Sequence, residues 1–206
     1  MSTLESYHDL VIKDGEFIGE FERLYSEFDD PWKQSKQPNP YARQAGITNI
    51  KRYNMKSVLE CGCGLGYYAQ NIYKQTGIIP KSVDTASSAI ERAKQLFPHL
   101  DFEQSDITKN LANYKNVDCI LFAEILWYVL PNLNDLFETM RRHFAGKYFM
   151  VVQVFYKGTQ QYGTEYFTSQ KELIDYVPFE LVSQVEGTTS VETTIETCTL
   201  FKIVDK

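Results

Sequence analysis

The glycine-rich stretch from Ser57 to Asn71, SVLECGCGLGYYAQN, constrains the fold of this chain more than any other part. A short apolar run, 57–59, is followed by Gly62, Gly64 and Gly66, and then by residues that are compatible with a helix. Glycines at alternate positions predict a sharp bend of the backbone. We therefore expect a buried strand, a tight loop and the first turns of a helix. Such a loop can bring bare main chain, with the unpaired N–H groups of a helix N-terminus, against a polar or anionic ligand.

Two common nucleotide-binding loops do not fit this stretch. A dinucleotide fingerprint that starts at Gly62 requires glycine at the position of Tyr67, where helix and strand pack closely. A phosphate loop requires Gly-Lys-Ser or Gly-Lys-Thr at the start of the helix, and the sequence has neither there. What remains is an acidic residue at the strand end followed by alternating glycines, Glu60-x-Gly62-x-Gly64-x-Gly66.

This pattern resembles the first motif of the class I S-adenosylmethionine-dependent methyltransferases, in which Gly-Cys-Gly is a common version. The resemblance implies that S-adenosylmethionine is the cofactor and that it lies against this loop. It extends over most of the chain and specifies the cofactor class, although not the substrate. The residues that it assigns to cofactor binding here are Glu60, Gly62, Cys63, Gly64 and Gly66.

The next two predicted strands also end in acidic residues. The strand expected at 78–83 ends in Asp84, and in a βαβ unit it lies beside the first strand, where an acidic residue can accept both ribose hydroxyls. A third short strand, 101–105, precedes the place where the family has a side chain and a backbone N–H that read the adenine edge. Over these two strand ends the resemblance adds to the cofactor site Asp84, Thr85, Asp106 and Ile107.

A fourth strand is predicted at 117–122, followed by AEILWYVL at 123–130, where the family has its fourth motif beside the methionine end of the cofactor and the substrate. We expect Glu124 to bind the cofactor and to be the catalytic candidate, and Trp127 and Tyr128 to contact the substrate. Glu124 has three open roles: a general base, a structural hydrogen bond to a neighbouring loop, or a wall of the methionine pocket. A base is needed only if the nucleophile carries a proton with a high pKa. No histidine has a visible partner, and no acidic pair resembles a magnesium site.

Residues 1–44 precede the first core strand and are predicted to form a helical cap over the cofactor cleft. Apolar residues at spacings of three and four predict an amphipathic helix over 17–28 that stops before Pro31. The segment LYSEFDDPW resembles the Asp-Pro-Trp segment of the nodulation-factor N-methyltransferases. Trp32 either staples the helix onto the core or forms a lid over cofactor or acceptor, and Tyr25 has the same two roles open.

Arg43 lies on the helix that is expected at 41–53, leading into the first strand. It is a candidate for binding the methionine carboxylate, and the alternative is a solvated arginine. After the fifth strand, predicted at 147–155, the segment YKGTQQYGTEYFT is rich in Tyr, Gln, Thr and Gly. Ligand sites of open α/β sheets form beyond the carboxyl ends of the strands, so we predict that this loop lines the acceptor pocket, unless it is an ordinary solvated excursion. Its candidate substrate-binding residues are Tyr156, Tyr162 and Tyr166.

Alternating strands and helices predict an α/β fold, a doubly wound, mostly parallel sheet of seven strands with helices on both faces. The end of the chain departs from this alternation. The runs 179–185 and 197–204 resemble strands, and the segment between them leaves no room for a crossover helix. They are predicted to pair as an antiparallel hairpin, which the methyltransferase fold has and a dinucleotide-binding fold lacks. We therefore expect a helical cap over 1–44 and a methyltransferase domain over 45–206.

Composition limits the partners. The chain has 206 residues, a net charge of −6 and a pI near 5.2, and no basic patch, which disfavours a nucleic acid partner. The four cysteines form no C-x-x-C pair and no metal-ligand spacing, so no metal is expected. The first ten residues do not resemble a signal peptide, and no apolar run approaches the roughly 18 residues of a membrane span. We expect a cytoplasmic monomer or homodimer with a small-molecule acceptor.

The prediction is thus a methyltransferase that acts on a hydroxyl or amine of a small acceptor, for example a sugar or another metabolite. A non-catalytic module that binds S-adenosylmethionine for regulation or assembly is the main alternative. Only the enzyme requires an open acceptor pocket beside the methyl group. A nicotinamide enzyme is disfavoured by Tyr67 and by the terminal hairpin. A protein or nucleic acid methyltransferase is disfavoured because AEIL, not an Asn-Pro-Pro-Tyr type tetrapeptide, follows the fourth strand.

Overall fold

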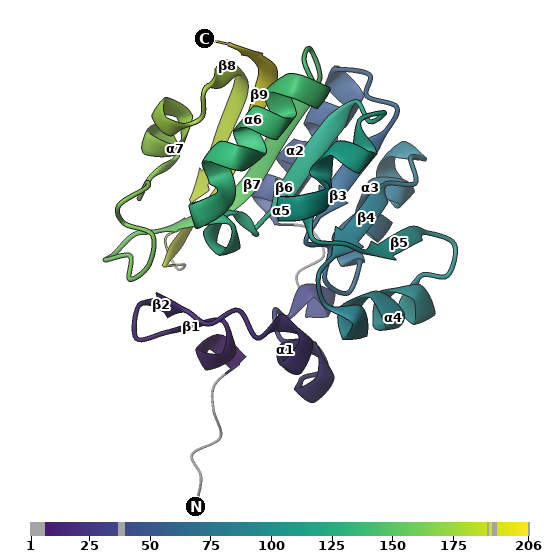
Figure 1. Ribbon diagram of the computed structural model, residues 1–206, viewed down its shortest axis with the longest axis vertical. Helices are drawn as coiled ribbons and strands as arrows, with labels where there is room; N and C mark the ends of the chain where they lie inside the picture. Colours follow the sequence, from purple (N-terminus) through teal and green to yellow (C-terminus); the bar gives the residue numbers. More distant parts are fainter. Residues whose placement is uncertain (1–6, 37–39, 189, 191–192, 206) are drawn as a thin grey trace, which may run out of the picture.

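The computed structural model describes residues 7–36, 40–188, 190 and 193–205. Within these residues seven strands form one sheet in the order β5-β4-β3-β6-β7-β9-β8, with helices on both faces (Figure 1). The predicted α/β fold is confirmed. The strands of this sheet are β3 (Val58–Cys61), β4 (Lys81–Asp84), β5 (Asp101–Gln104), β6 (Cys119–Ala123), β7 (Tyr148–Tyr156), β8 (Phe179–Thr188) and β9 (Thr194–Asp205).

Strand direction follows the prediction for the end of the chain. Neighbours from β5 to β7 pair in parallel, whereas β9 runs antiparallel to both β7 and β8. The β8–β9 hairpin is longer than the two apolar runs that predicted it, and its register shifts beside Phe179 and beside Leu181. The antiparallel strand β9 therefore lies between two strands that point the same way.

Alternation along the buried strands divides the core into two layers. In β6, Cys119, Leu121 and Ala123 face one layer, whereas Ile120 and Phe122 face the other. The first layer packs under α2 (Tyr41–Arg52) and α3 (Tyr67–Thr76), and the second under α6 (Leu133–His143). The other helices of the domain are α4 (Ser87–Leu96), α5 (Ile107–Asn110) and α7 (Gln170–Tyr176), with the 3₁₀ turns η3 (Leu111–Tyr114), η4 (Leu126–Tyr128) and η5 (Leu130–Asn132).

The segment before α2 differs from the helix predicted over 17–28. It starts with η1 (Tyr7–Leu10) and a two-stranded hairpin of β1 (Ile12–Lys13) and β2 (Glu16–Phe17), and only then comes α1 (Phe21–Glu27), with η2 (Gln34–Lys36) beyond it. Asp14 and Gly15 both have positive φ, which gives the turn of a tight hairpin. The prediction that Phe17 is helical was wrong, because this Asp-Gly turn and the positive φ of Gly19 stop the helix from extending back.

This N-terminal segment lies across the carboxyl ends of the strands (Figure 1). The helix α1 packs on α4, and Leu24 and Tyr25 are buried against Ala86 and Ala89. Residues 1–6 and 37–39 of the predicted cap lie outside the described residues. The segment thus closes over the edge of the sheet where the predicted site residues gather.

Candidate active site

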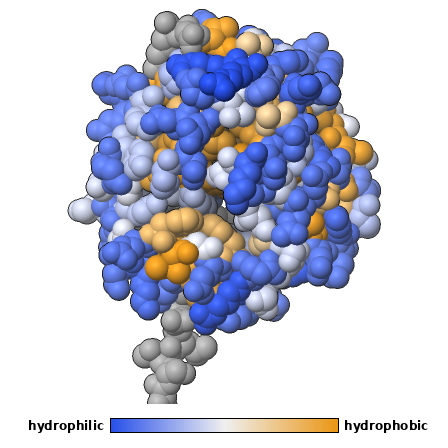
Figure 2. Space-filling model, in the orientation of Figure 1, coloured by the Kyte–Doolittle hydropathy of each residue, from blue (hydrophilic) through white to orange (hydrophobic). Residues whose placement is uncertain are grey.

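One cavity of about 530 Å³ lies between the N-terminal segment and the carboxyl ends of β3 to β7. In Figure 2 a hollow separates these two parts, with apolar side chains on its lower border. Its volume is within the range of small-ligand pockets. The predicted site residues that line it are Tyr25, Trp32, Arg43, Gly62, Asp84, Thr85, Asp106, Ile107, Glu124, Trp127, Tyr128 and Tyr156.

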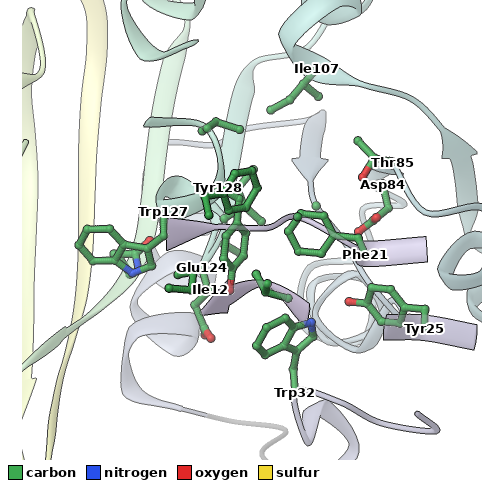
Figure 3. Close-up of a pocket in the computed structure, with 18 of the residues that line it drawn as sticks. Ile12, Phe21, Tyr25, Trp32, Asp84, Thr85, Ile107, Glu124, Trp127 and Tyr128 are labelled. Atoms are coloured by element: carbon green, nitrogen blue, oxygen red, sulfur yellow. The ribbon is translucent and has the colours of Figure 1, made fainter. Parts of the chain in front are cut away.

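Figure 3 shows how these side chains are distributed along the cavity. Asp84 and Thr85 lie at one end, and Trp127 lies at the opposite end. Glu124 and Tyr128 lie between them, and Trp32 points up from the N-terminal segment. The cavity therefore has a polar end at the tips of β4 and β5 and an aromatic end beyond β6.

Six predicted residues lie outside the cavity lining. Glu60 is buried within β3 and accepts a hydrogen bond from the Ser82 hydroxyl at 2.8 Å. Burial raises the pKa of Glu60 to about 7, and the Ser82 hydrogen bond opposes the shift. The others belong to the loop after β3 or to the loop after β7, and they are Cys63, Gly64, Gly66, Tyr162 and Tyr166.

The glycine loop has the expected sharp bend, with positive φ at Gly62, Gly64 and Gly66. Its N–H groups, which we expected to be free for a ligand, are bonded within the protein. Those of Gly62 and Cys63 donate to the Val83 carbonyl at 2.7 and 3.0 Å. A side chain on Gly62 would collide with Ile125, because its Cβ would come within 2.2 Å of the Cγ2 atom. The loop therefore presents little more than Gly62 to the cavity.

Asp84 connects this loop to the polar end of the cavity. Its carboxylate accepts hydrogen bonds from the N–H of Gly64 at 2.9 Å and the N–H of Ala86 at 3.0 Å. Burial raises the pKa of Asp84, although these backbone hydrogen bonds oppose the shift. A carboxylate has about four acceptor positions, so Asp84 retains capacity for ligand hydroxyl groups.

Asp106 is the N-cap of α5 and lies at the tip of β5. It accepts hydrogen bonds from the N–H and hydroxyl of Thr108, at 3.0 and 2.7 Å, and pairs with Lys109 at 2.8 Å. The pKa of Asp106 is lowered, because burial, which alone would raise it, is outweighed by the contacts with Lys109 and Thr108. Ile107 follows it on the cavity wall.

Arg43 and Glu124 meet inside the cavity although 81 positions separate them in the sequence. The Nη2 atom of Arg43 donates to Oε1 of Glu124 at 3.1 Å, and the guanidinium lies 5.3 Å from the ring centroid of Tyr68. Among the described residues, the buried Nε atom of Arg43 has no hydrogen-bond partner. Glu124 follows β6 directly and has φ of 63°, an uncommon conformation for a residue other than glycine. Arg43 is therefore not a solvated arginine, and one of its donors remains free.

The N-terminal segment contacts the glycine loop directly. Oε1 of Gln34 accepts a hydrogen bond from the Leu65 N–H at 3.1 Å. The Tyr25 hydroxyl sits over Gly64, where an added Cβ would come within 2.5 Å of it. Burial, followed by the charge of Asp84, raises the pKa of Tyr25 well above its usual value. Tyr25 is therefore a neutral hydroxyl group in the wall of the cavity.

Aromatic rings fill the other end of the cavity. Tyr128 contacts Phe17, Phe21 and Trp32, with ring centroids 6.1, 5.0 and 6.1 Å apart. Trp127 packs edge-on against Phe155 at 5.7 Å. Tyr162 lies outside the lining but stacks on Phe17 at 6.3 Å.

Sequence reasoning missed several residues of this wall. Phe17 and Phe21 were assigned to the core face of one long helix, and the Asp14-Gly15 turn was the signal that could have separated them. Gln153 was also missed, although a glutamine inside the apolar run of β7 is itself a signal. Gln34 left no signal, because its contact with the glycine loop joins distant parts of the chain.

The strand order, the glycine bend after β3 and the acidic tip of β4, all beside one cavity, define a class I S-adenosylmethionine-dependent methyltransferase. Residues 58–146 match the family model described as the methyltransferase domain. No curated protein sequence matches the chain. The predicted enzyme class and cofactor are therefore confirmed.

Solved structures share this fold. The methyltransferase domain of bacterial CtHen1 is 15% identical and superposes with a TM-score of 0.64, covering 81% of this chain and 98% of that one. A TehB-like enzyme from Corynebacterium glutamicum is 17% identical with a TM-score of 0.61, covering 86% and 97%. Geranyl diphosphate C-methyltransferase from Streptomyces coelicolor, solved with Mg²⁺, geranyl diphosphate and S-adenosyl-L-homocysteine, is 11% identical with a TM-score of 0.57, covering 78% of each chain. At these identities the likeness is one of fold.

Two further features concern the described residues as a whole. Among those residues, no helix combines the length and apolar character that crossing a membrane requires. Nor do three or more histidine, cysteine, aspartate or glutamate residues in that part of the chain come together as metal ligands would.

Proposed function

We propose that this methyltransferase transfers the methyl group to a hydroxyl or amine of a small acceptor molecule. The observation that carries this proposal is a single cavity with a polar end at Asp84, an aromatic end at Trp127, and Glu124 between them. A cofactor in the polar half leaves an aromatic chamber next to it. In this arrangement one enclosed space serves both reactants.

The residues at the polar end fit S-adenosylmethionine. Asp84 has acceptor capacity for the ribose hydroxyls, and Thr85 lies beside it. Asp106 and Ile107 border the adenine position, and Gly62 lets the main chain approach the ligand. When bound, the cofactor supplies a methyl group on a positively charged sulfur.

Arg43 is proposed to bind the methionine carboxylate. Arg43 is 6% exposed and lines the cavity, and its Nε atom lacks a hydrogen-bond partner within the described residues. A carboxylate is the group that a guanidinium binds most strongly, through paired hydrogen bonds. The ion pair with Glu124 orients the guanidinium for this contact.

Glu124 is proposed to accept the proton of the acceptor's hydroxyl or amine. Its side chain is 39% exposed and faces the cavity between the two ends. The Glu124 N–H donates to the Val152 carbonyl at 2.7 Å, which fixes the backbone from which the carboxylate projects. Holding the acceptor in line with the methyl group and the sulfur supplies much of the acceleration, and the aromatic walls exclude water.

The N-terminal segment is proposed to be a cap that covers both reactants, with residues 1–44 as the cap and 45–206 as the catalytic domain. Tyr25, Trp32 and Phe21 line the cavity from this segment, while the strand ends line it from the other side. The roles of Trp32 as a packing residue and as a lid are compatible in this arrangement.

Isotope transfer tests the acceptor class. The enzyme is incubated with S-adenosylmethionine that carries a deuterated methyl group and with the small-molecule fraction of a cell extract, or with its protein and nucleic acid fractions. We expect deuterated methyl on oxygen or nitrogen of compounds in the small-molecule fraction. A Glu124→Gln variant keeps a side-chain oxygen for Arg43 but cannot take a proton, so it is expected to lose much more in transfer rate than in affinity for S-adenosyl-L-homocysteine. Label found only in macromolecules, or only on carbon, contradicts the proposal.

A further inference from the structure

Glu124 places a negative charge beside the aromatic end of the cavity. We define the acceptor chamber as this end, which is lined by Phe17, Phe21, Trp127, Tyr128 and Tyr156. The Glu124 side chain is 39% exposed and faces the cavity between the acceptor chamber and the polar end (Figure 3). The pKa of Tyr156 is raised, first by burial and then by the charge of Glu124. The carboxylate therefore acts on the wall of the chamber.

Arg43 uses only one oxygen of this carboxylate. Its Nη2 atom donates to Oε1 of Glu124 at 3.1 Å, and Oε2 has no hydrogen-bond partner among the described residues. The Arg43 side chain is 8% exposed against 39% for Glu124, so the carboxylate is the more accessible member of the pair. In the proposed complex Arg43 also binds the methionine carboxylate, so that one guanidinium serves two carboxylates. Oε2 of Glu124 is thus left as an acceptor for a further ligand.

Positive charge is scarce in the rest of the lining. Of the described residues that line the cavity, only Arg43 is cationic near pH 7, because burial lowers the pKa of His8 and keeps its ring neutral. The carboxylates of the lining are Asp84, Asp106 and Glu124. The first two lie at the polar end, where ribose and adenine are proposed to bind. Glu124 is therefore the carboxylate that an acceptor molecule meets.

The aromatic rings of the chamber suit a cation as well as an apolar group. The Tyr128 ring has the rings of Phe21 and Phe17 near it, at centroid distances of 5.0 and 6.1 Å. The faces of aromatic rings are negative, and they attract an ammonium group through cation–π contacts. An anion in the chamber would instead face both these rings and the Glu124 carboxylate. The combination of rings and carboxylate therefore favours an organic cation.

We propose that the acceptor substrate is a basic amine, which binds as an ammonium ion to Oε2 of Glu124 and places its apolar part between the rings of the acceptor chamber. The inference rests on the proposed function and narrows the acceptor from a hydroxyl or amine to an amine. It makes Glu124 a specificity-determining residue as well as the proton acceptor. A neutral alcohol in the same place gains nothing from the charge.

The ammonium ion must lose a proton before its nitrogen can attack the methyl group. That proton passes to Oε2 of Glu124, which frees a lone pair on the nitrogen. The lone pair forms the new N–C bond to the methyl carbon while the C–S bond breaks, and the electron pair of that bond stays on sulfur. The positive charge thus moves from sulfur to the methylated amine, and Glu124 gives its proton to solvent.

Three benzene derivatives of similar size test this inference as probes. Their dissociation constants for the protein saturated with S-adenosyl-L-homocysteine are measured by saturation-transfer NMR titration at pH 7. Benzylamine is a cation, benzyl alcohol is its neutral counterpart and benzoate is an anion. We expect benzylamine to bind about tenfold more tightly than either of the others, the effect of one hydrogen bond between charged groups. If benzyl alcohol or benzoate binds as tightly as benzylamine, the inference is overturned.

Variants connect the preference to the Glu124 carboxylate. Glu124→Gln removes the charge but keeps a side-chain oxygen for Arg43. It is expected to raise the dissociation constant of benzylamine about tenfold and to leave that of benzyl alcohol unchanged. Glu16→Gln, at an exposed position of β2 outside the cavity lining, is the matched control and should change neither. If both probes weaken equally in Glu124→Gln, or if Glu16→Gln has the same effect, the inference is overturned.

The isotope-transfer experiment separates this inference from the proposed function. Deuterated methyl on nitrogen of small molecules supports both. Label on oxygen alone supports the proposed function but overturns this inference, and label on carbon alone overturns both. If the wild-type protein does not bind S-adenosyl-L-homocysteine in calorimetry, the cavity has been assigned wrongly, and the inference falls with it.

Discussion

Gly64 is needed mainly because side chains of the N-terminal segment pack directly against it. An added Cβ would come within 2.5 Å of the Tyr25 hydroxyl and 3.1 Å of Nε2 of Gln34. Both distances are shorter than an ordinary van der Waals contact. Gly77 has a similar positive φ, 75° against 54°, but an added Cβ there meets nothing within 4 Å. A substitution at Gly77 therefore tests backbone strain alone, whereas one at Gly64 tests strain together with the contact with the N-terminal segment.

For Gly64→Ala we expect a loss of S-adenosyl-L-homocysteine affinity of at least about tenfold, because the methyl group pushes Tyr25 and the cap off the loop. Gly77→Ala carries a similar backbone strain, on the order of 1 kcal/mol of stability, and should leave the affinity unchanged. Calorimetric titration of both variants measures the difference. Equal affinities would mean that the cap contact at Gly64 does not matter for binding.

Asp84 carries the second prediction at this scale. The N–H groups of Gly64 and Ala86 donate to different oxygens of Asp84, so Asp84→Asn loses one of these two hydrogen bonds together with the charge and part of the acceptor capacity for the ribose. Cofactor affinity should fall by about 1 to 3 kcal/mol, measured by calorimetry. Asp101→Asn, at the exposed start of β5 and paired with Lys81, is the control and should bind normally. Unchanged affinity in Asp84→Asn would remove Asp84 from the ribose site.

Glu60 predicts a pH dependence of stability. Its pKa is about 7 in the folded protein and 4.5 without burial, so the folded state holds the proton more tightly. Stability from this group is therefore fully present below pH 4.5 and declines as the pH rises towards 7. Glu60→Gln removes this decline. The difference in unfolding free energy, variant minus wild type, should increase by about 3 kcal/mol between pH 4.5 and pH 8, measured by urea denaturation. A constant difference would contradict the raised pKa.

At the scale of elements, α1 is held in place by two contacts with α4. The Arg92 guanidinium donates to the carbonyls of Tyr25 and Phe28, both at 2.9 Å, and to that of Asp29, at the C-terminal end of α1. Glu22 accepts hydrogen bonds from the N–H and hydroxyl of Ser88 at the start of α4. These contacts lower the pKa of Glu22. Seven residues make a short helix that depends on such tertiary contacts.

Loss of Arg92 should therefore loosen α1 without unfolding the sheet. In Arg92→Met, hydrogen exchange of the amides in 21–28 should accelerate about tenfold or more, while the amides of β3, β6 and β7 stay protected. Lys94→Met, which removes a charge from an exposed position of the same helix, is the control and should leave both regions unchanged. Acceleration across the whole domain would instead indicate that α1 and the sheet open together.

At the scale of the whole molecule, the cavity is lined by the N-terminal segment on one side and by the carboxyl ends of the strands on the other. A ligand that fills it binds only the folded state. At a concentration 100 times its dissociation constant, S-adenosyl-L-homocysteine should stabilise the protein by about 2.7 kcal/mol. For a chain of 206 residues this corresponds to a rise in Tm of roughly 5 to 10 °C, measured by calorimetry.

Adenosine at the same concentration provides the matched comparison. It lacks the methionine part that Arg43 is proposed to bind, so its stabilising effect should be smaller than that of the full product. Removing the guanidinium in Arg43→Met should bring the two ligands closer together. If adenosine and the full product stabilise the wild-type protein equally, the methionine carboxylate has no partner in the cavity.

Local patterns in the sequence determined the framework of this protein. The alternating glycines after β3, the acidic ends of β4 and β5, and the lack of room for a helix between β8 and β9 each lie within a short stretch, where bond geometry and periodicity act. These features predicted the sheet, its terminal hairpin, the enzyme class and the cofactor. The prediction of a helix over 17–28 was wrong because the Asp14-Gly15 turn places Phe17 in a hairpin despite its helical spacing from the later apolar residues.

Only the tertiary structure decided which distant residues meet in the walls of the cavity. The Arg43–Glu124 pair, the seat of Tyr25 on Gly64 and the contact of Gln34 with Leu65 join residues that are far apart in the sequence. It also placed Glu60 inside the sheet and turned the loop N–H groups inward, where neighbouring strands and the N-terminal segment satisfy them. Such contacts depend on the relative positions of whole elements, and no spacing within a single segment records those positions.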